Sequence, residues 1–107
     1  MRKIITHIIN DAQGVHQFTL HVDPGHAWLE IPRALYNNLQ HTTGLQVSQY
    51  SRMSERAVYA EEDCDMPLVL EALDKASINY EVNEFIHAST NNNIRNYVSY
   101  KSYGDPG

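Results

Sequence analysis

Five consecutive residues, Glu61-Glu62-Asp63-Cys64-Asp65, place four carboxylates around a single thiol, and we call them the acidic run. Such carboxylates can dock on a basic protein surface or ligate a hard cation. A structural role is also open, because Asp63 and Asp65 precede a predicted helix and can stabilise its positive end. The same negative charges raise a neighbouring thiol pKa, which makes Cys64 a poor nucleophile.

A second group of polar residues surrounds a predicted Asp-Pro-Gly turn at residues 23–25. If His21, Asp23 and His26 meet there, they could bind a metal ion or share a proton. Alternatively, Asp23 closes the turn through its side chain and His26 is an exposed strand residue. We favour this structural alternative, because no two histidines have the i, i+4 spacing of a helical metal site. We therefore expect no metal and no cofactor.

The C-terminal segment mixes tyrosines with two cations, in the order Arg95, Tyr97, Tyr100 and Lys101. Tyrosines interleaved with bases can stack single-stranded nucleotides, and Tyr and Arg are also enriched at protein interfaces. Two cations make a weak electrostatic groove, and the net charge of −5 argues against general nucleic-acid binding. We therefore assign Arg95 and Tyr97 to a protein-binding surface, together with the carboxylates of the acidic run.

The elements that must position these residues follow from apolar periodicity, which predicts an α+β fold. We expect a mainly antiparallel sheet with two helices packed on one face. Pro32 suits the first position of one helix and Gly44 its exit, while Pro67 lies in the first turn of the other, capped by Asp63 or Asp65. The expected strands cover residues 4–9, 17–22, 27–31, 46–52, 56–61, 80–86 and 97–100.

Length and composition predict one domain over residues 1–107, with a possible extension strand at 1–15 and a frayed tail at 104–107. One cysteine excludes an internal disulfide and suits a reducing cytoplasm. No stretch approaches the roughly 20 apolar residues that span a bilayer, so we expect no membrane partner. An exposed edge strand would allow a homodimer.

Charge is distributed unevenly along the chain. Residues 55–84 carry nine acidic and two basic residues, a formal charge of −7, whereas the rest of the chain is at +2. An asymmetry of this kind affects what a protein associates with rather than how it folds. We therefore expect a partner with a basic surface.

Several pieces of the sequence resemble a group of small uncharacterised proteins encoded by bacteriophages, plasmids and other mobile elements. The matching pieces are Asp-Pro-Gly-His-Ala-Trp-Leu at 23–29, Pro-Arg-Ala-Leu at 32–35, Ser-Gln-Tyr-Ser at 48–51, Val-Tyr-Ala followed by the acidic run at 58–65, and Ile-Arg-Asn-Tyr at 94–97. Residues 1 to about 15 and Ala60 depart from the pattern. The resemblance implies a genetic setting in which small acidic proteins block host factors, including CRISPR effectors and restriction enzymes.

These observations favour a non-catalytic protein-binding module, an inhibitor of a host defence complex in the bacterial cytoplasm. Its acidic surface would engage a basic host protein. Two alternatives remain open. One is a metal-dependent or acid–base enzyme centred on His21, Asp23 and His26, and the other is a single-stranded nucleic-acid binder using the C-terminal tyrosines.

Overall fold

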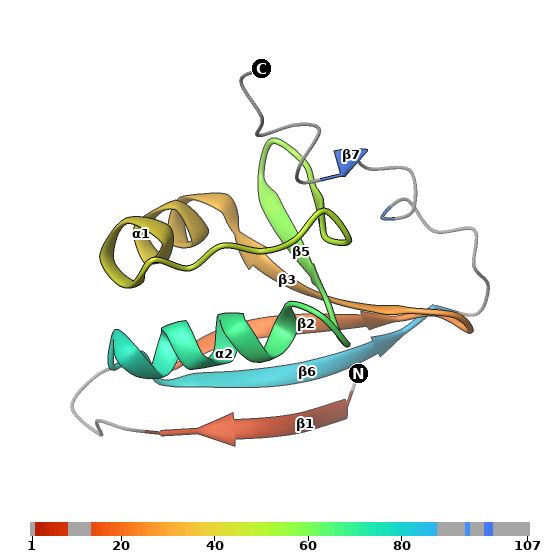
Figure 1. The fold of residues 1–107 in the computed structure, drawn as a ribbon. Coiled ribbons are helices and arrows are strands. Elements are labelled where there is room, and N and C mark those ends of the chain that lie inside the picture. Colours follow the sequence, from red (N-terminus) through yellow and green to blue (C-terminus); the bar gives the residue numbers. More distant parts are fainter. Residues whose placement is uncertain (1, 9–13, 88–93, 95–97, 100–107) are drawn as a thin grey trace, which may run out of the picture.

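Strands and two helices build an α+β fold, shown in Figure 1. The structure is a computed structural model that describes residues 2–8, 14–87, 94 and 98–99. The elements follow one another as β1 (Arg2–His7), β2 (His16–Val22), β3 (Ala27–Pro32), α1 (Arg33–Thr43), β4 (Arg52–Met53), β5 (Ala57–Glu61), α2 (Met66–Lys75), β6 (Tyr80–Ile86) and β7 (Val98–Ser99).

All of these strands join one sheet in the order β1-β6-β2-β3-β5-β4-β7. The prediction of a mainly antiparallel sheet is wrong, because β2 and β6 pair in parallel and the sheet is mixed. After β5 the chain passes through α2 and enters β6 between β1 and β2 (Figure 1). Apolar alternation identifies a strand and its buried face, but it carries no information on strand direction.

Local signals predicted the β2–β3 hairpin and α1 correctly. β2 and β3 pair antiparallel around the turn at 23–25. Gly44 ends α1 with a left-handed φ of 77°, and its N–H donates to the carbonyl of Gln40 at 3.1 Å. The helix begins one residue later than predicted, because Pro32 is the last residue of β3 and α1 begins at Arg33.

The expected strand over residues 46–52 is largely absent. Only Arg52–Met53 forms β4 and pairs with β5, and residues 44–51 have no strand pairing. The backbone of this segment is held by side chains instead. The N–H of Val47 donates to the hydroxyl of Tyr36 on α1 at 3.2 Å, and serines 48 and 51 bond to Asp65. Such side-chain bonds replace the ladder that the periodicity predicted.

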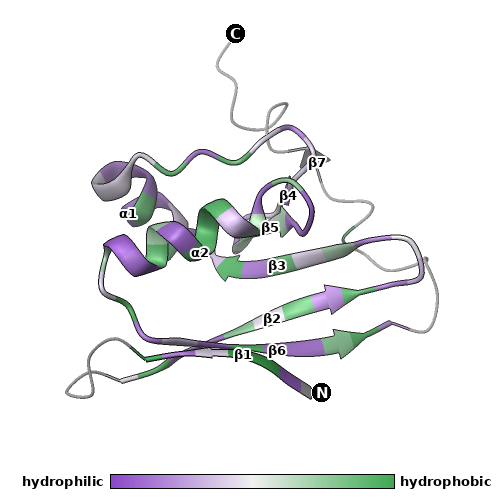
Figure 2. Cartoon of the chain, turned by 60° about the horizontal axis from the view of Figure 1, so that its bottom comes forward, coloured by the Kyte–Doolittle hydropathy of each residue, from purple (hydrophilic) through white to green (hydrophobic). Residues whose placement is uncertain are grey.

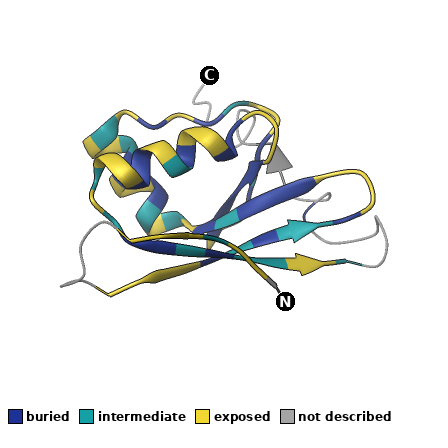
Figure 3. Ribbon diagram, turned by 90° about the horizontal axis from the view of Figure 1, so that it is seen from below, coloured by how far each residue is buried: buried dark blue, intermediate teal, exposed yellow. Residues whose placement is uncertain are grey.

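Alternate residues of β3 and β5 belong to two different apolar clusters. The main cluster contains Leu29, Ile31 and Val58 together with the buried residues of both helices. The smaller cluster contains Trp28, Ala57, Tyr59 and Ile94. Figure 3 shows the central strands as buried and the outer sides of the helices as exposed, and Figure 2 shows hydrophobic and hydrophilic positions alternating along both helices. β3 and β5 are therefore buried on both faces.

Candidate functional site

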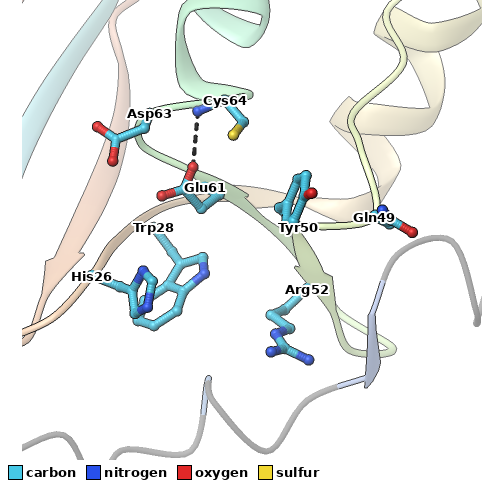
Figure 4. A pocket seen from close by; sticks show the side chains of 8 residues that line it. All are labelled: His26, Trp28, Gln49, Tyr50, Arg52, Glu61, Asp63 and Cys64. Atoms are coloured by element: carbon cyan, nitrogen blue, oxygen red, sulfur yellow. Dashed lines mark hydrogen bonds between the residues drawn. The ribbon is translucent and has the colours of Figure 1, made fainter.

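A pocket of about 380 Å³ lies where the β2–β3 turn, the start of β4 and the acidic run meet (Figure 4). Its lining combines aromatic, acidic and basic side chains: His26, Trp28, Gln49, Tyr50, Arg52, Glu61, Asp63 and Cys64. Part of the acidic run and one residue of the Asp-Pro-Gly-His turn, which the sequence presents as separate features, thus share one cavity.

Strand pairing positions the walls of this pocket. The β3–β5 ladder places Trp28 opposite Glu61, and the β4–β5 ladder places Arg52 opposite Tyr59. Residues directly opposite in an antiparallel ladder project from the same face of the sheet. The pocket therefore lies on the face that carries the smaller apolar cluster. The ring of His26 lies 5.4 Å from that of Trp28, measured between centroids.

Asp65 is buried at 1% exposure, and its carboxylate serves the fold. Its Oδ2 accepts hydrogen bonds from the backbone N–H of Ser48 at 3.0 Å, from the Ser48 hydroxyl at 2.7 Å, and from the Ser51 hydroxyl. Asp65 occupies the N-cap position of α2, as expected, but its side chain makes no capping hydrogen bond. The side chain ties the 48–51 segment to the start of the helix, so it does not reach the protein surface.

Glu61 is also buried, at 8% exposure, but it lies at the wall of the pocket. Its Oε2 accepts a hydrogen bond from the backbone N–H of Cys64 at 2.8 Å, drawn as a dashed line in Figure 4. Its own N–H donates to the Ser51 hydroxyl at 3.0 Å. The first bond fixes the carboxylate and the second fixes the backbone of Glu61, at the point where the strand turns toward α2.

Glu62 and Asp63 are the exposed members of the acidic run. Partial burial, followed by the charges of Asp63, Glu61 and Glu84, raises the pKa of Glu62. In the part of the chain that the structure describes, no lysine, arginine or histidine lies within ion-pair distance of Glu62 or Asp63. These two carboxylates therefore repel one another without a compensating cation.

Cys64 is exposed beside them and is not activated. A hydrogen bond with Glu61 raises the pKa of the thiol, and desolvation and the charges of the neighbouring carboxylates act in the same direction. The sequence-based expectation of a raised thiol pKa is confirmed. A thiol of this kind stays protonated at neutral pH and is a weak nucleophile.

His21, Asp23 and His26 do not converge on one site. Asp23 Oδ1 accepts hydrogen bonds from the N–H groups of Gly25 and His26, both at 2.8 Å, so the turn-closing role is confirmed. His26 is exposed at the pocket, whereas His21 bonds to other residues. Over the described ranges, no group of three or more His, Cys, Asp or Glu side chains could hold a metal ion.

The partners of His21 form a hydrogen-bonded chain that the sequence analysis missed. His21 Nε2 lies 2.7 Å from Glu30 Oε1, and His21 Nδ1 lies 2.9 Å from His87 Nε2. Burial, followed by the charge of His21, lowers the pKa of His87, and Asp23 acts in the opposite direction. No sequence signal pointed to His87, because its contact with His21 depends on the parallel pairing of β2 and β6.

The pocket residues Trp28, Tyr50 and Arg52 were also missed as site residues. Trp28 carried one usable signal, since it lies on β3 at a position alternating with Leu29 and so faces away from the main core. No sequence signal pointed to Tyr50 and Arg52, because both belonged to the strand expected over residues 46–52.

Arg95, Tyr97, Tyr100 and Lys101 lie outside the described residues. Neither of the described helices is long and apolar enough to cross a membrane. Comparison with protein-family models, with curated proteins and with solved structures finds no match to this chain.

Proposed function

We propose that this chain is a non-catalytic protein-binding module whose acidic run docks on a basic surface of a partner protein. The observation that carries the proposal is the pair Glu62 and Asp63. Both are exposed next to a pocket, and no base within the described ranges lies in ion-pair distance of either.

Electrostatics supports a cationic partner. The raised pKa of Glu62 reflects partial burial and then the charges of three neighbouring carboxylates. A lysine or arginine from a partner would relieve that repulsion, and charge complementarity of this kind accelerates association and selects the partner. An anionic partner would add to the repulsion.

The sheet face around the pocket suits the same role. We propose that both helices cover the face of Leu29 and Ile31, which leaves the pocket on the opposite face, beside the buried Trp28, for a partner. The common cluster of strand and helix residues supports this arrangement. Tyr50, exposed at 61% beside the pocket, is the type of side chain enriched at protein interfaces. Arg95 and Tyr97 remain a predicted part of this surface.

The non-catalytic part of the proposal rests on the chemistry of the candidate groups. Cys64 has a raised thiol pKa, and both ring nitrogens of His21 are engaged by other side chains. Inhibition of a host defence complex of the CRISPR or restriction type, in the cytoplasm of a bacterial host, is a further step of the proposal. It rests on the resemblance to proteins of mobile elements and on the acidic surface.

The experiment that tests docking is affinity capture from bacterial host lysate with two charge-reversed variants. Glu62→Lys/Asp63→Lys removes the proposed contact, and Glu55→Lys/Glu71→Lys makes the same change in net charge at two exposed positions outside the acidic run. We expect a basic partner that the wild type and the control variant retain and the first variant loses.

Salt provides a second criterion. Raising NaCl from about 0.1 M to about 1 M shortens the Debye length from about 10 Å to about 3 Å and should release the partner. Equal capture by both variants, or capture insensitive to salt, would refute docking through the acidic run.

A further inference from the structure

The pocket beside the acidic run has a charge and a shape that restrict what it can hold. Trp28 and Tyr50 supply aromatic surface, Glu61 and Asp63 supply two carboxylates, and Arg52 supplies one cation. With His26 neutral, the lining carries a formal charge of −1. One added positive charge makes the occupied pocket neutral.

This lining disfavours other classes of ligand. An anion would meet two carboxylates, and a purely apolar group would desolvate them without compensation. A metal ion lacks a ligand set, since the described residues contain no suitable group of three. A flat organic cation satisfies both halves of the lining, because aromatic faces attract cations and carboxylates accept their N–H groups.

Glu61 is already oriented as an acceptor for such a cation. Cys64 N–H occupies its Oε2 at 2.8 Å, and this bond fixes the carboxylate. The Cys64 thiol also hydrogen-bonds to this carboxylate, which lies at the wall of the pocket. In Figure 4, Glu61 and Asp63 lie on the side of the pocket away from Arg52, next to Trp28 and His26. Trp28 and the two carboxylates therefore lie on one side of the pocket, and Tyr50 and Arg52 lie on the other side.

We propose that this pocket takes the side chain of an arginine from the partner protein, a step that rests on the proposed docking function. Arginine fits better than lysine, because its planar guanidinium stacks on aromatic rings and its fork of N–H groups matches carboxylates. Lysine offers a compact, strongly hydrated charge with no flat face. The exposed ring of Tyr50 provides a stacking surface, and Asp63 and Glu61 provide the acceptors.

The single tryptophan of the chain makes this proposal measurable without knowing the partner. The probes are three capped tripeptides, Gly-Arg-Gly, Gly-Lys-Gly and Gly-citrulline-Gly, at low ionic strength. Citrulline keeps the planar shape of arginine and removes its charge. Binding is followed by Trp28 fluorescence and by the NMR signal of its indole N–H, so that a silent fluorescence response is not mistaken for absence of binding.

We expect saturable binding of the arginine peptide, about fivefold weaker binding of the lysine peptide, and none of the citrulline peptide. Asp63→Asn should lower the affinity for the arginine peptide about tenfold, because one charge-assisted hydrogen bond is lost. Glu55→Gln removes a negative charge at an exposed position outside the pocket and should leave affinity unchanged.

Equal binding of the citrulline and arginine peptides would overturn the proposal. So would the absence of a saturable response in both signals up to about 50 mM peptide, since 1 mM affinity already corresponds to only about 4 kcal/mol.

The two proposals fail differently. Loss of partner capture on reversal of Glu62 and Asp63, combined with no peptide binding, keeps docking and refutes the arginine pocket. Peptide binding without a partner that depends on the acidic run supports the pocket and refutes docking.

Discussion

Replacing Asp65 by alanine should destabilise the fold strongly, although the residue belongs to a run that looks solvent-exposed in the sequence. The side chain is 1% exposed, and its Oδ2 accepts hydrogen bonds from Ser48 N–H, Ser48 Oγ and Ser51 Oγ. Asp65→Ala leaves three donors without this acceptor. Ser51 is itself fully buried, whereas Ser48 is half-buried and can recover a bond to water.

The magnitude follows from the burial of each donor. A hydrogen bond to a charged group contributes about 1.5–3 kcal/mol, and a buried donor left without a partner costs about 1–3 kcal/mol. The full cost of an unsatisfied donor should apply to Ser51 and part of it to Ser48. Removing the buried carboxylate also removes its desolvation penalty, which offsets part of this loss. We expect a net loss of about 3 kcal/mol in the free energy of unfolding, or about 12 °C in Tm for a domain of this size.

The assay is urea unfolding followed by circular dichroism, with Asp63→Ala as the matched control. Asp63 is exposed and has no ion-pair partner among the described residues, so its replacement should change stability by no more than about 0.5 kcal/mol. A loss below about 1 kcal/mol for Asp65→Ala would show that the serine bonds contribute little. An equal loss for both variants would refute the division of the acidic run into inner carboxylates, which are buried (Glu61 and Asp65), and outer carboxylates, which are exposed (Glu62 and Asp63).

Three further predictions concern stability. Gly44→Ala should cost about 1 kcal/mol in urea unfolding, because φ is 77° and the new Cβ would meet no atom within 4 Å, so the cost is that of the backbone conformation alone; a neutral effect would contradict the left-handed helix end. Tyr36→Phe should cost about 1–2 kcal/mol in thermal unfolding, because the buried N–H of Val47 loses its acceptor, and an unchanged Tm would contradict that bond. Burial, followed by the charge of His21, lowers the folded-state pKa of His87 below its ordinary value. The contribution of His87 to stability is therefore fully present above about pH 6.5 and is lost as pH falls through the folded-state pKa. His87→Gln should therefore reduce the loss of stability between pH 7.5 and pH 5, and an unchanged pH profile would contradict the assignment.

Elements with local signals were predictable from the sequence. The turn at 23–25 fixes the β2–β3 hairpin, because Asp23, Pro24 and Gly25 each favour that geometry for a separate reason. Gly44 ends α1 because a left-handed conformation suits a residue without Cβ. The parallel pairing of β2 with β6 was not predictable in this way, since it brings together residues 66 apart in the sequence, such as His21 and His87.

The candidate site was predictable only in part, for the same reason. The composition of the acidic run identified its charge, but not which carboxylates are exposed. That depends on Ser48 and Ser51, which belong to a segment whose alternation predicted a strand. Once this segment turns toward Asp65 instead, Tyr50 becomes a wall of the pocket. One incorrect strand therefore concealed both the buried carboxylate and part of the pocket.

The members of the acidic run differ in what they do: Asp65 serves the fold, Glu61 serves the fold and lines the pocket, and Glu62 and Asp63 carry the proposed docking. The Glu61 carboxylate accepts a hydrogen bond within the turn between β5 and α2, and the Asp65 carboxylate ties the 48–51 segment to the start of α2. Within the described ranges the side chains of Glu62 and Asp63 make no hydrogen bond of this kind, and burial and repulsion raise the pKa of Glu62. The fold gains nothing from that repulsion, whereas a binding surface gains from it, because a rigid turn presents both charges without the entropic cost of ordering them on association. In the proposed docking, Glu62 and Asp63 would therefore meet a basic partner from a turn that is already held in place.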